Sequence, residues 1–273
     1  MSTSQLRGTV EGVLLGNRRV VFVESILLLI LVWELSARVF AITDLIASPL
    51  LVGASMYEML QAGEWVMHFV ASMQRIVYGF VAALVVGIVG GIALGVSNFW
   101  GRVLRYYVLV GMAVPGLFVV IFTAMAFGIS DTTPMLATAV ITAPFVVDMI
   151  QSGVENVDSD LLNMSSAFGV SRTRVYKRVL FSSILPEIFS SIRFTFSVAW
   201  KVTILAEVVI SNVGIGFLIR DNMSRFSMVG VLQYVVLFVI VMMIIEYGVF
   251  SKTEQYLFSW REDVKSSMGT GPR

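Results

Sequence analysis

Six long apolar segments constrain this sequence more than any other feature. They lie at about residues 20–40, 66–96, 106–128, 134–152, 186–210 and 228–250. A helix needs about 20 mostly apolar residues to cross the hydrocarbon core of a bilayer. We therefore predict an all-α integral membrane protein with about six transmembrane helices.

The composition excludes several classes of protein. Hydrophobic residues make up 57% of the chain and charged residues only 14%, and the mean hydropathy is +0.87. Soluble domains carry about 25% charged residues. A soluble enzyme, a disordered protein and a nucleic-acid-binding protein are thus excluded. The net charge of +1 selects no partner, and the absence of cysteine excludes disulfides and cysteine-based metal sites.

The lysines and arginines predict the orientation in the membrane. If the N-terminus is cytoplasmic, thirteen of the 19 basic residues lie inside and four lie at or near the outer face, while Arg193 and Lys201 fall within a span. An excess of basic residues marks the cytoplasmic side. We predict a cytoplasmic N-terminal segment at 1–19, an uncleaved first span, a transmembrane region at 20–250 and a cytoplasmic tail at 251–273.

Short patterns predict local features of the helices. Ser48-Pro49 is a helix start signal, so residues 49–62 are expected to form a short interfacial helix. Glycines recur every four residues at Gly87, Gly91 and Gly95, a spacing that lets two helix backbones pack closely. Pro115, between two glycines, should kink the third span. The kink is either static or a flexible element that lines a solute path.

Two charges lie inside the fifth apolar segment, at Lys201 and Glu207. A charge at mid-bilayer costs roughly 2.5–3.5 kcal/mol on insertion scales, so each should face water or a partner. Six residues on a helix turn through about 600°, so the two side chains point about 120° apart and make a poor pair. Lys201 either attracts an anionic solute or pairs with Asp148 or Glu246. The neighbouring Trp200 is either packing or part of a gate.

The longest predicted cytoplasmic connection runs from 153 to 185. Its pattern predicts two short helices, separated by a turn at Gly169, with Ser171 as the cap of the second helix. The second helix carries four basic residues: Arg172, Arg174, Lys177 and Arg178. The loop is either a docking element for another protein or an interfacial segment whose charges only fix the topology.

This loop is where the sequence resembles a known family. Residues 157–172, continuing to Leu185-Pro186, are similar to the EAA loop of type I ABC importer permeases, and closest to the nitrate/sulfonate/taurine branch. Further resemblance lies in Ser48-Pro49, in Ser72–Phe80 with Arg75 and Gly79, in the glycine run 87–95, and in Ala199-Trp200, Ala206-Glu207 and Gly214–Ile219. The likeness covers about residues 25–260. The sequence departs from the family pattern where Asn163-Met164-Ser165 replaces Glu-Ala-Ala.

The resemblance implies a type I ABC importer permease fold with a cytoplasmic coupling-helix loop at about 156–186. It assigns contact with the ATPase to residues in and after this loop: Asp160, Asn163, Ser166, Ala167, Gly169, Ser171, Arg172 and Pro186. It makes four residues candidates for the translocation path: Pro115, Trp200, Lys201 and Glu207. The implied solute is a small organic or inorganic anion such as a sulfonate, taurine, nitrate or a carboxylate.

The resemblance also implies partners and a location. The expected partners are two ABC ATPase subunits, a second permease copy or a paralogue, a periplasmic or lipid-anchored solute-binding protein, and the lipid bilayer. The expected location is the bacterial cytoplasmic (inner) membrane, with both termini cytoplasmic. No nucleotide-binding motif of the Walker A type is present in the sequence, so we expect a permease that is not itself an enzyme, with no cofactor and no metal.

Two other classes remain as alternatives. An ion-coupled secondary transporter would use Lys201 and Glu207 as a proton relay, and inverted repeats would be expected. A small integral membrane enzyme would need clustered histidine or acidic residues, whereas His68 is the only histidine. Neither alternative requires the basic cytoplasmic loop.

Overall fold

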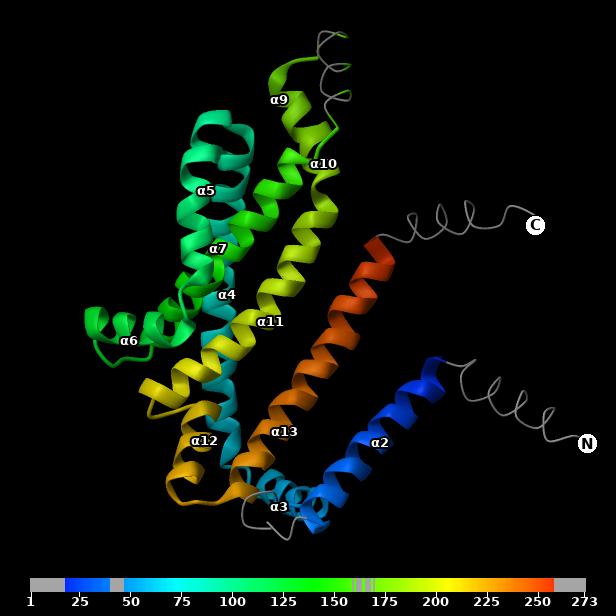
Figure 1. The fold of residues 1–273 in the computed structure, drawn as a ribbon, viewed down its shortest axis with the longest axis vertical. Coiled ribbons are helices and arrows are strands. Elements are labelled where there is room, and N and C mark those ends of the chain that lie inside the picture. The colour runs from blue at the N-terminus through cyan, green and yellow to red at the C-terminus, as the bar shows by residue number, and fades with distance from the viewer. Residues whose placement is uncertain are drawn as a thin grey trace, which may run out of the picture. The chain divides into compact units, whose positions relative to one another are not determined.

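The computed structural model describes residues 18–39, 47–158, 160, 164, 168 and 170–257. The secondary structure of this part is helical throughout (Figure 1). The longer helices are α2 (Arg18–Val39), α4 (Trp65–Val96), α7 (Thr133–Glu155), α11 (Leu185–Ile210) and α13 (Met228–Ile245). The shorter helices are α3 (Pro49–Ala62), α5 (Asn98–Ala113), α6 (Gly116–Phe127), α9 (Arg172–Val175), α10 (Phe181–Ser183) and α12 (Ile215–Ser224), with π-helical turns at Tyr176–Leu180 and Glu246–Phe250.

The helices confirm the predicted all-α membrane architecture. Four helices in the described part are long and apolar enough to span a bilayer, and the number rises to six if each of two bent pairs is one span. One pair is α5 and α6, bent by 95°; the other is α11 and α12, bent by 49°. The six predicted segments thus each coincide with a helix or a bent pair.

The third segment differs from its prediction at its start. We predicted it to begin near residue 106, but α5 begins at Asn98, directly after α4. The Ser97 hydroxyl accepts a hydrogen bond from the Trp100 amide at 3.2 Å, so it caps the new helix. Hydropathy locates apolar residues rather than helix ends, and the first two turns of α5 carry Asn98, Arg102 and Arg105 among apolar residues. The predicted kink is present as a break at Val114 and Pro115.

The described chain forms two compact units. The first comprises the described residues up to Gly63 together with Asn222–Val235. Within it, Ser48 caps the predicted helix α3, and the Ser55 hydroxyl donates to the Gln233 side-chain oxygen at 2.6 Å. The second comprises Glu64–Asp221 and the described residues from Val236 onward, and it contains the main helix bundle.

A row of glycines on α4 forms a groove that receives side chains of α7 in the second unit. The Cβ positions of the α4 glycines point at side chains of α7, in the order Gly87 on Val146, Gly91 on Ile150 and Gly95 on Val154. Both sets repeat every four residues and ascend in the same direction, so α4 and α7 run parallel with interlocking ridges. The prediction that these glycines serve close helix packing is confirmed.

The segment that precedes α11 is anchored on the same core. Leu180, Ile184 and Ile188 are buried and cluster with Val146, Ile150 and Val154 of α7. These residues connect the end of the predicted coupling loop to α11 through packed side chains. The stretch before α11, the first turn of α11 and α7 therefore share one packed core.

Candidate functional site

A buried ion pair links α4 to α11. The Arg75 side chain is 3% exposed and the Glu207 side chain is fully buried, and Arg75 Nη1 lies 2.8 Å from Glu207 Oε1. The second carboxylate oxygen of Glu207 accepts hydrogen bonds from the Ser72 hydroxyl at 2.7 Å and the Gly216 amide at 3.0 Å. Both oxygens of the buried carboxylate are therefore satisfied, as a buried charge requires.

The same residues fix the bend between α11 and α12. Arg75 Nη1 also donates to the Val213 carbonyl at 2.6 Å, and the Ile215 amide donates to the Ser72 hydroxyl at 2.8 Å. Gly214 has φ +125°, and a Cβ at Gly214 would meet the Glu207 carboxylate. Glycine is needed there for both backbone conformation and space. The separate sequence pieces around Ser72, Glu207 and Gly214 thus form one polar network.

Arg75 reaches one further loop of the second unit. Its Nη2 lies 2.5 Å from Asp131, a residue of the α6–α7 loop whose side chain is 82% exposed. One arginine thereby joins α4, the α6–α7 loop and the α11–α12 bend. His68 stabilises the same bend, because its Nδ1 accepts from the Gly214 amide at 3.1 Å and its ring stacks on Phe217.

Sequence reasoning selected Glu207 but missed its partner. Arg75 lies 132 residues earlier, in the Ser72–Phe80 segment that entered the prediction only through the family resemblance. The pairing could have been suspected because both residues lie in segments that resemble the same family. Lys201 and Glu207 do not form a relay: Glu207 is buried at Arg75, whereas Lys201 is exposed on a different face of α11.

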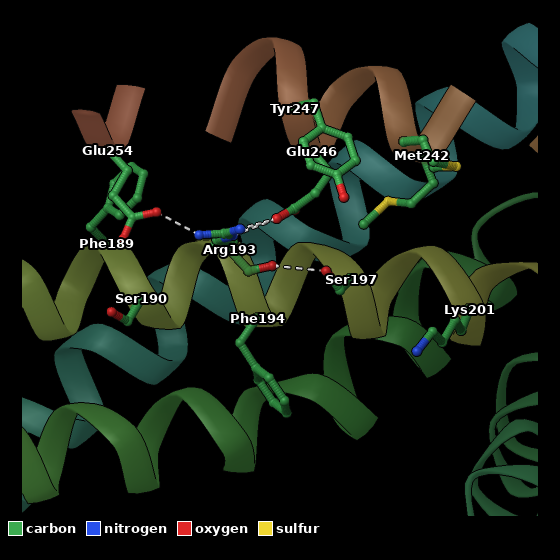
Figure 2. A pocket seen from close by; sticks show the side chains of 11 residues that line it. Phe189, Ser190, Arg193, Phe194, Ser197, Lys201, Met242, Glu246, Tyr247 and Glu254 are labelled. Atoms are coloured by element: carbon green, nitrogen blue, oxygen red, sulfur yellow. Dashed lines mark hydrogen bonds and ion pairs between the residues drawn. The ribbon is translucent and has the colours of Figure 1, made fainter. Parts of the chain in front are cut away.

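A hollow of about 630 Å³ lies between α11 and the stretch from α13 to Glu254 (Figure 2). Arg193 of α11 projects toward Glu246 and Glu254 and forms an ion pair with each. Phenylalanine, methionine, serine and tyrosine side chains complete the lining, among them Phe194, Ser197 and Met242. The site combines an apolar wall with one arginine held by two carboxylates.

Lys201 lies at the other end of this hollow. Figure 2 shows its amino group turned away from the Arg193 ion pairs. Within the described ranges, no carboxylate lies within ion-pair distance of Lys201, so neither Asp148 nor Glu246 is its partner there. Glu246 is paired with Arg193 instead. Lys201 is thus an exposed cation in the middle of an apolar helix.

The other two path candidates have different surroundings. Trp200 is 3% exposed, and its ring stacks on Phe238 of α13 with centroids 4.1 Å apart. Pro115 is exposed and precedes the first residue of α6, at the 95° bend. Close to this bend, a Cβ at Gly111 would lie 3.0 Å from Pro144 of α7, so the α5 backbone approaches α7 closely.

Part of the predicted coupling loop lies outside the described residues, namely Asn163, Ser166, Ala167 and Gly169, and so does the side chain of Arg172. The Asp160 amide donates to the Asp158 carboxylate at 2.8 Å. The Ser171 carbonyl accepts from the amides of Arg174 and Val175 at 2.9 and 3.1 Å, so a helix follows it as predicted. Pro186 lies in the first turn of α11, where proline is tolerated.

Residues 79–250 match the sequence model of the family described as binding-protein-dependent transport system inner membrane component. The chain belongs to this family. Among the described residues of the permease, no group of three histidine, cysteine, aspartate or glutamate side chains could hold a metal ion. The confirmed resemblance makes it an ABC importer permease of the nitrate/sulfonate/taurine family.

Known relatives agree with this assignment. The taurine transport system permease protein TauC of Escherichia coli K12 is 26% identical over 249 residues, which cover 88% of this permease and 90% of TauC. The nitrate import permease protein NrtB of Synechocystis sp. is 30% identical over 151 residues, 55% of each chain. A solved structure of the MetNI methionine ABC transporter, in an inward-facing conformation, has a TM-score of 0.58 at 17% identity. It covers 65% of this permease and 89% of that chain, and it confirms the predicted fold.

Proposed function

We propose that this permease forms the membrane path of an ATP-driven importer for a small anion. The observation that carries the anionic part is Lys201, an exposed cation without an ion-pair partner among the described residues of α11. An intramembrane charge of this kind marks a solute or ion pathway more often than a lipid-facing surface. The named solutes of relatives, taurine and nitrate, fit the same chemistry, since each carries an anionic group.

The permease supplies no chemical energy of its own in this proposal. Two ABC ATPase subunits dock on the loop at about 156–186 and drive it as they bind and hydrolyse ATP. The packing of Leu180, Ile184 and Ile188 on α7 supports a direct transmission of that movement to α11. The path then alternates between outward and inward access, because two packed arrangements of the helices differ in their affinity for the ATPase states.

The proposal places the permease in the bacterial inner membrane with both termini in the cytoplasm. A second copy of this chain, or a paralogue with an intact Glu-Ala-Ala segment, completes the path. A periplasmic or lipid-anchored solute-binding protein delivers the solute to the outer face. The family description names a binding protein and the inner membrane, which supports the location and the solute-binding partner.

The first test separates the importer from an ion-coupled transporter. The tagged permease is purified in mild detergent, its co-purifying proteins are identified, and uptake of taurine, nitrate and an alkanesulfonate is measured in vesicles. We expect an ATPase subunit to co-purify, a Gly169→Asp change to remove it, and uptake to require ATP. A permease that purifies alone and drives uptake from a proton gradient without ATP would contradict the importer.

A second test addresses Lys201. We expect Lys201→Met to abolish uptake while the ATPase still co-purifies, because the substitution removes the positive charge but keeps a long flexible side chain. Lys252→Met is the matched control, since Lys252 is also exposed but lies beyond the π-helical turn that follows α13. Uptake is measured at several solute concentrations. Normal uptake by Lys201→Met would refute a role for this residue in solute contact.

A further inference from the structure

We propose that Arg193 is a second anion contact on the solute path. Its ion pairs with Glu246 and Glu254 close the path at this point. The hollow between α11 and α13 is, in this proposal, a water-filled part of the path. The ion pairs of Arg193 divide it into a part lined by Ser197 and Lys201 and a part lined by Ser190. The second part lies nearer the end of α11 at Leu185, which the proposed topology puts in the cytoplasm. This inference rests on the proposed function, but its test does not depend on knowing the solute.

The first step concerns what fills the hollow. Lys201 lines it, is exposed and has no ion-pair partner among the described residues. A lysine in mid-span cannot face lipid tails without a large cost. The polar lining points the same way, because Ser190, Ser197 and Glu254 would otherwise contact hydrocarbon. Ser197 and Glu254 already have partners in the fold, the carbonyl and the guanidinium of Arg193. The group that most needs water is therefore Lys201.

The second step concerns the order of charges along α11. Lys201 lies eight residues beyond Arg193, which is about 12 Å along a helix axis. Ser197 lies midway and also lines the hollow. Figure 2 shows the ion-paired Arg193 on one side of Ser197 and Lys201 on the other. An anion that leaves Lys201 toward the Leu185 end of the helix must therefore pass Arg193.

The third step concerns how the closure is built. Glu246 and Glu254 are eight residues apart, and in a regular α-helix they would point about 80° away from each other. The turn at Glu246–Phe250 is π-helical, and its wider winding reduces this angle. Both carboxylates thus reach Arg193. π-helical turns occur often at functional sites, and here the turn explains how one arginine holds two acids.

The fourth step concerns how easily the closure opens. The Arg193 side chain is 37% exposed, and those of Glu246 and Glu254 are 23% and 48% exposed. Water competes with half-exposed ion pairs, so an exchange of partner has a low cost. An anion can replace one carboxylate on the guanidinium, which forms bidentate contacts with oxyanions. Arg193 can therefore receive the anion when α13 moves away from α11.

The test uses the absence of cysteine from this chain. Ser197→Cys adds one thiol inside the hollow, in the complex reconstituted into vesicles. Two water-soluble methanethiosulfonate reagents are compared, one with a sulfonate group and one with a trimethylammonium group. Each rate is divided by that reagent's rate with a small free thiol in solution. On this scale we expect the anionic reagent to be favoured about ten-fold, because Lys201 is a cation with no ion-pair partner among the described residues. Ser190→Cys, on the other side of the ion pairs, is the positional control.

The closure itself is tested by adding Glu246→Gln to Ser197→Cys. We expect labelling from the cytoplasmic side to become several-fold faster, while labelling of Ser190→Cys stays unchanged. Glu34→Gln is the matched control, because it breaks an arginine ion pair elsewhere, with Arg38. A thiol at 197 that no water-soluble reagent reaches would overturn the water-filled hollow. Labelling that is unchanged by Glu246→Gln would overturn the closure, and ATP-driven uptake would remain a separate result.

Discussion

At the scale of single residues, the decisive feature is where each intramembrane charge finds its partner. Glu207 and Lys201 lie on one helix six residues apart, yet they have opposite surroundings. Glu207 is fully buried with Arg75, Ser72 and the Gly216 amide, so it serves the architecture. Lys201 is exposed and lines a hollow. The buried charge and the exposed charge therefore need different experiments.

Arg75→Gln should destabilise the permease strongly. The substitution leaves the Glu207 carboxylate buried without a cation, and breaking such a pair costs about 3–5 kcal/mol. The folded fraction after heating in detergent, followed by size-exclusion chromatography, measures the loss. Arg38→Gln is the control, since the pair of Arg38 with Glu34 is intrahelical and partly exposed and should contribute at most about 1 kcal/mol. The double variant Arg75→Gln/Glu207→Gln should recover part of the stability. Equal losses for Arg75→Gln and Arg38→Gln would contradict the assignment.

At the scale of elements, the contact between α4 and α7 is set by backbone proximity. A Cβ at Gly91 would lie 2.6 Å from the Cβ of Ile150, whereas one at Gly90 would lie 3.4 Å from the nearest atom of Val147. We therefore expect Gly91→Ala to cost about 1–3 kcal/mol through overpacking, and Gly90→Ala to be close to neutral. The same heating assay compares these adjacent substitutions. Equal effects would show that helix propensity, rather than contact with α7, sets the change in stability.

The elements also show which features a sequence can predict. The packing role of Gly87, Gly91 and Gly95 could be predicted because their spacing is a local pattern. The start of α3 at Ser48-Pro49 could be predicted because a helix cap involves only neighbouring residues. The pairing of Arg75 with Glu207 is not local, and periodicity along one helix cannot choose among distant partners. The start of α5 at Asn98 was missed since hydropathy marks membrane depth rather than helix ends. The Arg193 cluster was missed because it depends on a π-helical turn.

At the scale of the whole molecule, the proposed orientation rests on where the basic residues lie. In the second unit, the basic residues at the expected outer end are bonded within the fold: Arg75 to Glu207, and Arg220 to the carbonyls of Val208, Val209 and Ser211. At the opposite end, Arg102, Arg174, Arg178 and Lys252 are exposed. The basic residues that can face a cytoplasmic leaflet therefore lie at the end that carries the coupling loop.

This charge distribution leads to a prediction for the permease in its membrane. A single cysteine replaces either Asn212, exposed in the α11–α12 bend, or Ser183, exposed just before α11. The chain has no other cysteine, so a membrane-impermeant maleimide reports on that position alone. We expect Asn212→Cys to be labelled once the outer membrane is permeabilised, and Ser183→Cys only after the inner membrane is opened as well. The reverse pattern would invert the topology, move the predicted ATPase contact to the periplasmic side and so contradict the importer. Labelling of both positions before the inner membrane is opened would mean that one predicted span does not cross, and the bent pair of α11 and α12 would then be a re-entrant segment.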